Sequence, residues 1–367
     1  MRPKIIAFYL PQFHPTPDND KWWGKGYTEW TNVAKAKPLF KGHYQPHIPA
    51  DLGFYDLRIP EIREQQAELA REAGVDGFCY WSYWFGDGKE ELEMPFNEVL
   101  NNGKPDFPFM LCWANESWHS KFWNKDGSVD KTTLIEQQYL GDEDYIKYFY
   151  HRLHAFKDSR YIKAENKPVF MIYDWDIPEI DEFIKKWNEL ARKEGFDGIY
   201  FIAHLKSDIS PERISAIFKK GFNAINTVRI WTSEFKNPTS LSSIFKKFKR
   251  KYLGLPHVRE YKDCINDLFE KEDEKDTIYP TLVPNWDHSP RSGASGVIFH
   301  HATPELFEEH CIHVLKRVSK KPDPNFVFIR AWNEWGEGNH MEPDLKYGKG
   351  YINALHNAIK FVFPENI

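Results

Sequence analysis

Two glutamates lie three residues apart in the stretch from Arg330 to His340, which reads RAWNEWGEGNH. Glu334 and Glu337 follow an apolar run over residues 326–329 that predicts a buried strand. If the chain coils after this strand, both carboxylates face one side, with Cβ atoms roughly 5–6 Å apart. A retaining glycosidase needs about this separation between its two carboxyl groups. We therefore predict that Glu334 and Glu337 are catalytic.

Tryptophans accompany these glutamates at positions 332 and 335. Apolar walls favour the protonated form of a nearby carboxyl, and an indole ring can stack on a sugar. Two close carboxyls in such a pocket should separate in pKa, leaving one ionised and one protonated. A plain strand end with solvated glutamates is the alternative, but ordinary turns have no need of large aromatic residues.

Eight apolar runs alternate with helical patterns along the chain, which predicts a single (β/α)8 TIM barrel over residues 1–367. No linker, change in composition or internal repeat divides the sequence. The predicted strands are residues 4–10, 76–81, 107–113, 167–173, 198–203, 222–227, 277–283 and 326–331. The predicted helices are residues 58–74, 92–101, 142–157, 177–194, 211–220, 257–271, 303–320 and 348–361. Pro168 and Pro280 weaken two of these strands, because proline removes a ladder donor.

Polar and aromatic residues collect where the predicted strands end, and the loops that follow are long and rich in aromatic residues. Barrel active sites lie at this end, so we predict an aromatic cup lined with carboxylates. The predicted substrate-binding residues are Tyr9, Gln12, His14, Trp30, Trp81, Tyr83, Trp84, Trp113, Asn115, Glu116, Asp174, His204, Trp286, Arg291, Trp332 and Asn333. Core packing is the alternative for the tryptophans, and we expect it for at least two. Arg291 either clamps the substrate or pairs with Asp287.

Three motifs carry a resemblance to a known family: YLPQFH at residues 9–14, WWGKGYTEW at 22–30 and WNEWGEG at 332–338. They resemble the WbsX-type proteins over nearly the whole chain. Those proteins are similar to glycoside hydrolase family 99, the endo-α-mannosidase and endo-mannanase barrels. This remoter likeness rests on the barrel and the Glu-x-x-Glu spacing.

The resemblance implies a retaining hydrolase that cleaves an α-linked, mannose-like bond in a polysaccharide or oligosaccharide, without a cofactor or an enzyme nucleophile. In the implied mechanism, Glu334 is the base that helps the substrate's own 2-hydroxyl displace the leaving group. Glu337 protonates the leaving oxygen and later activates water.

Three other functions remain open. Asn115-Glu116 has the form of a glycosidase acid/base site, which would make Glu334 an ordinary nucleophile. WbsX-type proteins often carry a glycosyltransferase label tied to O-antigen and surface-polysaccharide synthesis, and Asp174-Trp175-Asp176 has the short Asp-x-Asp form that transferases use. The hydrolase is favoured, since no phosphate-binding glycine motif is present. A binding-only carbohydrate barrel would have no use for paired glutamates.

No histidine arrangement matches a zinc hydrolase among the 15 histidines, so we predict no metal. His14, His204 and His288 are instead candidate substrate contacts.

The overall composition narrows the possible partners. A net charge of −5 without a dense basic stripe argues against nucleic acid, and 14 tryptophans suit a carbohydrate ligand. No apolar run is long enough for a signal peptide or a membrane span, and four cysteines lack paired spacing. These features predict a reduced, cytoplasmic protein. The basic run at residues 245–251 predicts a solvated helical face. Nothing in the sequence predicts the oligomeric state.

Overall fold

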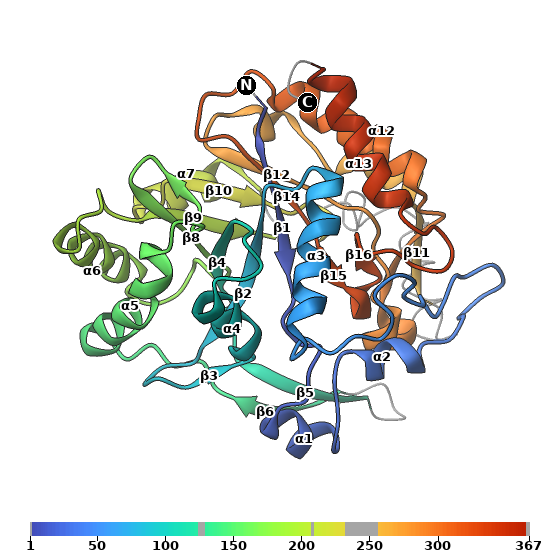
Figure 1. The fold of residues 1–367 in the computed structure, drawn as a ribbon, viewed down its shortest axis with the longest axis horizontal. Coiled ribbons are helices and arrows are strands. Elements are labelled where there is room, and N and C mark those ends of the chain that lie inside the picture. Colours follow the sequence, from blue (N-terminus) through green and yellow to red (C-terminus); the bar gives the residue numbers. More distant parts are fainter. Residues whose placement is uncertain (1, 124–128, 207–208, 232–255, 365–367) are drawn as a thin grey trace. The chain divides into compact units, whose positions relative to one another are not determined.

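The computed structural model describes residues 2–123, 129–206, 209–231 and 256–364 (Figure 1). The basic run at 245–251 lies outside these ranges. The chain divides into two compact units, which are described separately. The first combines residues 1–78 with 228–367, and the second is residues 79–227.

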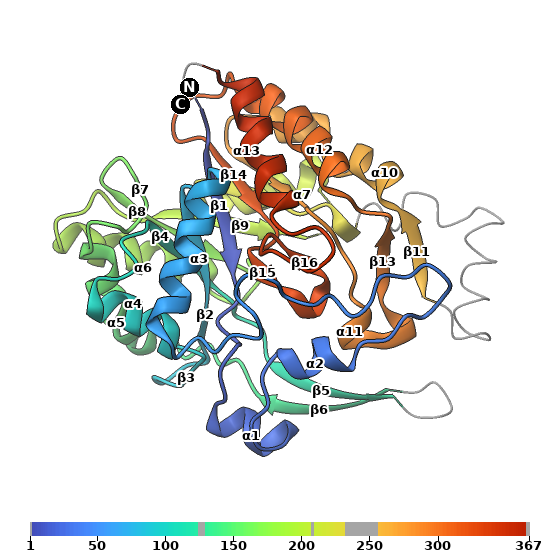
Figure 2. The ribbon, with the colours of Figure 1, turned by 45° about the vertical axis from the view of Figure 1, so that its right-hand side comes forward.

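The first unit contains three parallel strands covered by long helices. The strands are β1 (Lys4–Tyr9), β12 (Ile278–Leu282) and β14 (Phe326–Ile329). The helices are α3 (Pro60–Ala73), α12 (Pro304–Val318) and α13 (Gly350–Val362). β14 lies between the other two strands, with Lys4 opposite Phe326 and Thr281 opposite Phe328. Figure 2 shows α12 and α13 packed side by side. All four residues of β14 are buried, as expected for a strand covered on both faces.

The second unit repeats the strand-then-helix pattern. Its parallel strands are β4 (Phe109–Trp113), β8 (Lys167–Ile172), β9 (Tyr200–Leu205) and β10 (Ala224–Thr227). Its helices are α4 (Met94–Asn102), α5 (Asp142–Lys157), α6 (Ile180–Lys193) and α7 (Pro211–Lys219). In α6, Ile180, Phe183, Ile184 and Trp187 are buried. Their spacing places them on one helical face, which explains why this segment packs as a helix.

β2 (Gly77–Trp84) begins in the first unit and continues into the second. It pairs with β1, and within the described residues the eight parallel strands form a closed (β/α)8 barrel, the predicted fold class. All eight predicted strands are confirmed with small changes at their ends, and Pro168 and Pro280 lie inside buried strands. The assignment of residues 1–367 to one domain stays a prediction.

One predicted helix is wrong. Residues 257–271 contain strand β11 (His257–Glu260), which pairs in parallel with β13 (Val297–His300). Only the short helix α10 (Tyr261–Cys264) and 3-10 turns follow. Tyr261, Cys264 and Leu268 are buried at helix-like spacing, and this spacing misled the sequence prediction.

The four cysteines are free and buried. Across the described residues, we find no helix of the length and apolarity that a membrane crossing requires.

Candidate active site

The chain coils tightly after β14, as the sequence predicts. Short strand β15 (Asn333–Glu334) pairs with β16 (Asn339–His340) in an antiparallel hairpin. A 3-10 turn, η4 (Trp335–Glu337), connects them. Glu334 therefore ends the strand and Glu337 ends the turn, and both are buried.

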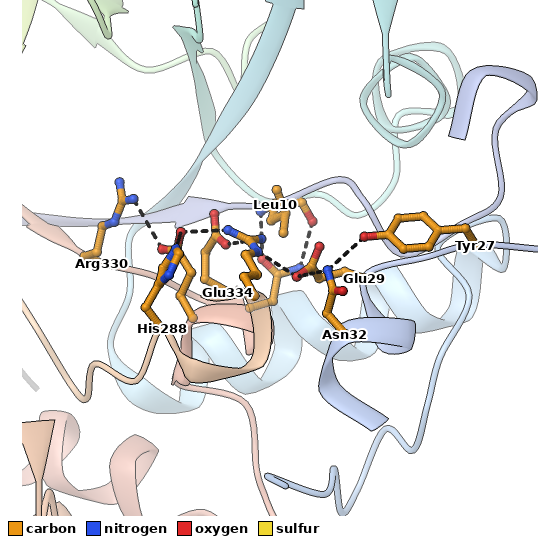
Figure 3. Close-up of polar contacts among 10 residues, drawn as sticks. Leu10, Tyr27, Glu29, Asn32, His288, Arg330 and Glu334 are labelled. Carbon is orange, nitrogen blue, oxygen red and sulfur yellow. Dashed lines mark hydrogen bonds and ion pairs between the residues drawn. The ribbon is translucent and has the colours of Figure 1, made fainter. Parts of the chain in front are cut away.

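One guanidinium joins the two glutamates (Figure 3). Arg291, in short helix α11 (Ser289–Ser292), donates from Nη1 to Oε1 of Glu337 at 2.7 Å. It also donates from Nη2 to Oε2 of Glu334 at 3.0 Å. Because one planar group reaches both carboxylates, they face a common point instead of diverging.

A third carboxylate binds the same arginine. Nε of Arg291 donates to Oε1 of Glu29 at 2.7 Å, and Glu29 is 2% exposed. Glu29 precedes helix α2 (Trp30–Lys35), and its backbone N–H donates to the carbonyl of Gln12. Sequence reasoning included Glu29 in a motif but missed its place in the site.

The alternative pairing of Arg291 with Asp287 is not found. Asp287 accepts hydrogen bonds from the Gln45 side chain and the Ser289 backbone, and its Oδ2 lies 2.7 Å from Nε2 of His43. These three partners contact both oxygens of the Asp287 carboxylate, and Arg291 binds the glutamates instead.

The two central glutamates differ in acidity. Burial, together with the charge of Glu337, raises the pKa of Glu334 to about 7, and Arg291 offsets only part of this effect. Burial would also raise the pKa of Glu337. The Arg291 charge, a hydrogen bond with His288 and the Arg330 charge outweigh it and hold that pKa well below its ordinary range. The charges and burial of the site thus favour a proton on Glu334 and a charge on Glu337.

Two glycines allow this arrangement to form. A Cβ atom on Gly336 would lie 1.8 Å from Oε1 of Glu29. Gly338 has φ +57°, and a Cβ there would lie 2.7 Å from Cβ of Asp287. Glycine at both positions therefore lets Glu29 and Asp287 pack directly against the turn.

Buried polar groups hold the hairpin in place. The Asn333 side chain accepts from the Leu10 N–H at 2.7 Å and donates to the Leu10 carbonyl at 3.0 Å. Glu342 accepts hydrogen bonds from Trp335, Gln66 and Tyr55 at 2.6, 2.6 and 2.9 Å. Burial raises the pKa of Glu342 to about 7 despite these donors. Sequence reasoning missed Glu342, which lies eight residues after Glu334 in the same stretch of the chain.

Most of the predicted aromatic contacts in the first unit are core residues. Tyr9, Trp30, Trp286 and Trp332 are at most 8% exposed. Trp30 donates to the Tyr55 carbonyl and packs against Trp335, with ring centroids 5.4 Å apart. The expectation that at least two tryptophans serve core packing is confirmed. Together with Asn333, these residues are better placed to position the carboxylates than to touch a ligand.

Three polar candidates in this unit differ in setting. Gln12 is half-buried, whereas His14 is buried, and burial lowers its pKa to about 4. His288 lies beside the pair, with Nε2 3.6 Å from Oε1 of Glu337.

The second unit gathers its predicted polar residues in a separate cluster. The Asn115 side chain accepts from the Asp174 N–H and donates to the Asp174 carbonyl, both at 2.8 Å. Glu116 has a side chain 51% exposed and pairs with Lys206 at 3.0 Å. Asp176 pairs with Lys220.

The aromatic residues of the second unit pack mainly on one another. Trp84 stacks on Tyr148, and Trp113 donates to the Trp84 carbonyl. Trp81 and His204 make an edge-on ring contact, with centroids 6.0 Å apart. Tyr83 is half-buried against Trp118. Trp81, Trp84, Trp113 and His204 are buried in this packing, and their predicted contact with a substrate stays a prediction.

Within the described ranges, one group of side chains has the composition of a metal site: His47, His340 and Asp344. Nδ1 of His47 lies 3.0 Å from Nε2 of His340, whose Nδ1 lies 2.9 Å from the Glu342 carbonyl. The ring centroids are 5.3 Å apart. At that centroid separation the two nitrogens point almost directly at each other, which is the geometry of a direct hydrogen bond.

Comparison with known proteins places the chain in a family. Residues 5–355 match the family described as Glycosyltransferase WbsX. Two proteins named WxcX, described as uncharacterized, from two strains of Xanthomonas campestris pv. campestris, are 34% identical over 358 residues. The alignment covers 97% of this chain and 49% of theirs, so the chain spans about half their length.

Two solved structures share the fold. A glycoside hydrolase-like protein matches with a TM-score of 0.59 and 15% identity, covering 97% of this chain and 94% of its own. A GH99 endo-α-mannosidase from Bacteroides thetaiotaomicron matches with a TM-score of 0.57 and 13% identity, covering 98% and 97%. With its sequence matched almost end to end, the chain belongs to the WbsX family.

Proposed function

We propose that this chain is a retaining glycoside hydrolase that cleaves an α-linked, mannose-like bond in a polysaccharide or oligosaccharide. The observation that carries the proposal is the pair Glu334 and Glu337, buried and joined through Arg291. Two carboxyls of opposite protonation state are what acid/base cleavage of a glycosidic bond requires.

The chemistry needs only the substrate, the pair and water. One carboxylate takes the proton of the 2-hydroxyl as that oxygen bonds to the anomeric carbon. The other carboxyl gives its proton to the leaving oxygen as the glycosidic bond breaks. The carboxylate left by the acid then takes a proton from water as the water oxygen attacks the anomeric carbon from the side of the leaving group. The other carboxyl returns its proton to the 2-oxygen as the epoxide-like ring opens, so the pair is restored and the configuration is retained.

The two roles require opposite protonation states. The family resemblance gives the proton to Glu337, whereas the charges around the pair favour a proton on Glu334. An α-mannosyl fluoride distinguishes these assignments, because fluoride leaves without protonation. We expect one of Glu334→Gln and Glu337→Gln to cleave the fluoride while failing on a disaccharide, and that residue is the acid. Loss of both substrates in both variants would refute a separate acid.

Glycosyl transfer is the second candidate, and the family's description favours it. The Asp-x-Asp residues make local contacts: Asp176 pairs with Lys220, and Asp174 accepts from the Asp176 N–H. The deciding assay incubates the protein with α-linked glycans, with and without nucleotide sugars and Mn²⁺. Cleavage without nucleotide supports hydrolysis, and product formed only from a nucleotide sugar refutes it.

The rival acid/base residue Glu116 has a weaker setting. Its carboxylate is half-exposed beside Lys206, whereas a general acid needs burial to hold its proton near neutral pH. Glu116 is therefore proposed as a residue that binds sugar hydroxyls.

A further inference from the structure

An exposed tryptophan lies on an ordered segment of the first loop. Trp23, the last residue of helix α1 (Pro17–Trp23), is 41% exposed. Its segment is fixed by hydrogen bonds: the Gly26 N–H donates to Asp20 Oδ1 at 2.7 Å, and the Gly24 N–H donates to the Asp20 carbonyl. These hydrogen bonds hold the partly exposed indole ring in place before a ligand arrives, which lowers the entropy cost of binding one.

A second aromatic ring connects Trp23 to the active site. The Tyr27 and Trp23 ring centroids are 5.8 Å apart. The Tyr27 hydroxyl accepts from Nδ2 of Asn32 at 2.8 Å, and the same Nδ2 lies 3.4 Å from Oε1 of Glu29. Figure 3 shows these contacts running from Tyr27 through Asn32 and Glu29 towards Glu334.

We propose that Trp23 and Tyr27 form a sugar-binding subsite beside the Glu334–Glu337 pair, taking a further unit of the same α-linked chain. The inference rests on the proposed function for the identity of the ligand. Stacking rings next to a hydroxyl and an amide suit a sugar, which has apolar C–H faces and polar edges. Continuity with the carboxylate cluster favours the glycan over a protein partner.

The position of Trp23 predicts dependence on chain length. Trp23 contacts Tyr27, and contacts through Asn32, Glu29 and Arg291 connect Tyr27 with the Glu334–Glu337 pair. A disaccharide across the catalytic pair would not need it, whereas a longer oligosaccharide would. The ring of Trp23 therefore contributes affinity for longer ligands rather than speed at the reacting bond.

The test titrates α-linked mannobiose and mannotriose into the Glu337→Gln protein, so that no ligand is consumed. Trp23→Ala in this background should weaken mannotriose binding about tenfold. It should leave mannobiose binding within about twofold and the melting temperature unchanged. Tyr27→Phe keeps the ring and should lose only a few-fold in affinity. The matched control is Phe361→Ala, since Phe361 is 61% exposed on α13.

The outcomes separate this subsite from the proposed reaction. Equal mannotriose affinity in the Trp23 and Phe361 variants, or no mannotriose binding at all, overturns the subsite. If wild-type protein cleaves mannotriose with the same KM as Trp23→Ala, hydrolysis stands and the subsite falls. Trp23-dependent binding without any cleavage by the wild type supports the subsite and refutes hydrolysis.

Discussion

The carboxylate cluster of the first unit and the Asn115–Asp174 cluster of the second unit are similar in sequence. Both follow barrel strands, and both mix acids, amides and tryptophans. In the first unit, Glu29, Glu334 and Glu337 are buried around Arg291. In the second unit, the Asn115 side chain binds backbone and Glu116 reaches solvent. Burial and arginine pairing thus distinguish the carboxylates of the first cluster from those of the second.

The largest difference should appear when single carboxylates are neutralised. Glu334→Gln and Glu337→Gln should each lower kcat/KM on an α-linked mannan oligosaccharide by about 10²–10⁴. Glu116→Gln should lower it only a few-fold, because this carboxylate is half-exposed and pairs with Lys206. Kinetics of the three purified variants provide the measurement. If the Glu116 variant were as impaired as the other two, the acid/base role would have to be assigned to the second unit.

The next difference concerns the cations. Arg291→Gln should reduce activity about 10²-fold and shift the acidic limb of the pH–rate profile upwards, because Arg291 lowers the pKa of both partner glutamates. Arg291→Lys should restore part of the charge effect without the bidentate geometry. The counterpart is Lys206→Gln, which breaks an exposed pair worth at most about 1 kcal/mol. An unshifted profile in Arg291→Gln would contradict the charge coupling.

A smaller effect should follow from filling the space at Gly336. In Gly336→Ala the new methyl displaces the Glu29 carboxylate, and we expect activity to fall about tenfold. Glu29→Ala makes room for that methyl. In a double-mutant cycle, adding Gly336→Ala to Glu29→Ala should therefore have little further effect. Additive losses in activity would show that the glycine acts through something other than Glu29.

The smallest effect is on stability. The pKa of Glu334 is raised from 4.5 to about 7, so ionisation opposes folding. The stability that protonated Glu334 contributes is complete below about pH 4.5 and is lost as the pH rises through 7. Between pH 5 and 8, the ionisation of Glu334 should lower the free energy of unfolding of the wild type by on the order of 2 kcal/mol. Glu334→Gln should abolish this decrease, and urea unfolding at both pH values provides the measurement. Glu116→Gln is the control and should keep the wild-type slope, and equal slopes in all three proteins would refute the raised pKa.

The sequence was sufficient for the barrel and for the central glutamates. Continuous apolar runs identify buried parallel strands. A spacing of three residues brings Glu334 and Glu337 to one side when the chain coils after β14. The partners of the pair could not be predicted in this way. Glu29 and Arg291 are 262 positions apart, and no local pattern encodes such a contact. The burial of Trp30 and Trp332 was equally hidden, because composition does not reveal which face of a ring is covered.

The wrong helix at residues 257–271 has a related cause. The apolar spacing of this segment is compatible with a helix, but its first residues form a strand in which Val258 pairs with Ile298. Tertiary pairing overrode a local preference there, as it often does for short segments.

The order in which the chain supplies the site has a consequence for biosynthesis. Glu29 follows the first strand, Arg291 follows β12, and Glu334 and Glu337 come only after β14. During translation, the early carboxylate must therefore remain without its arginine while more than two hundred and fifty further residues emerge. A nascent chain halted before the last strand would already contain most of the barrel, yet it would lack both glutamates of the proposed catalytic pair.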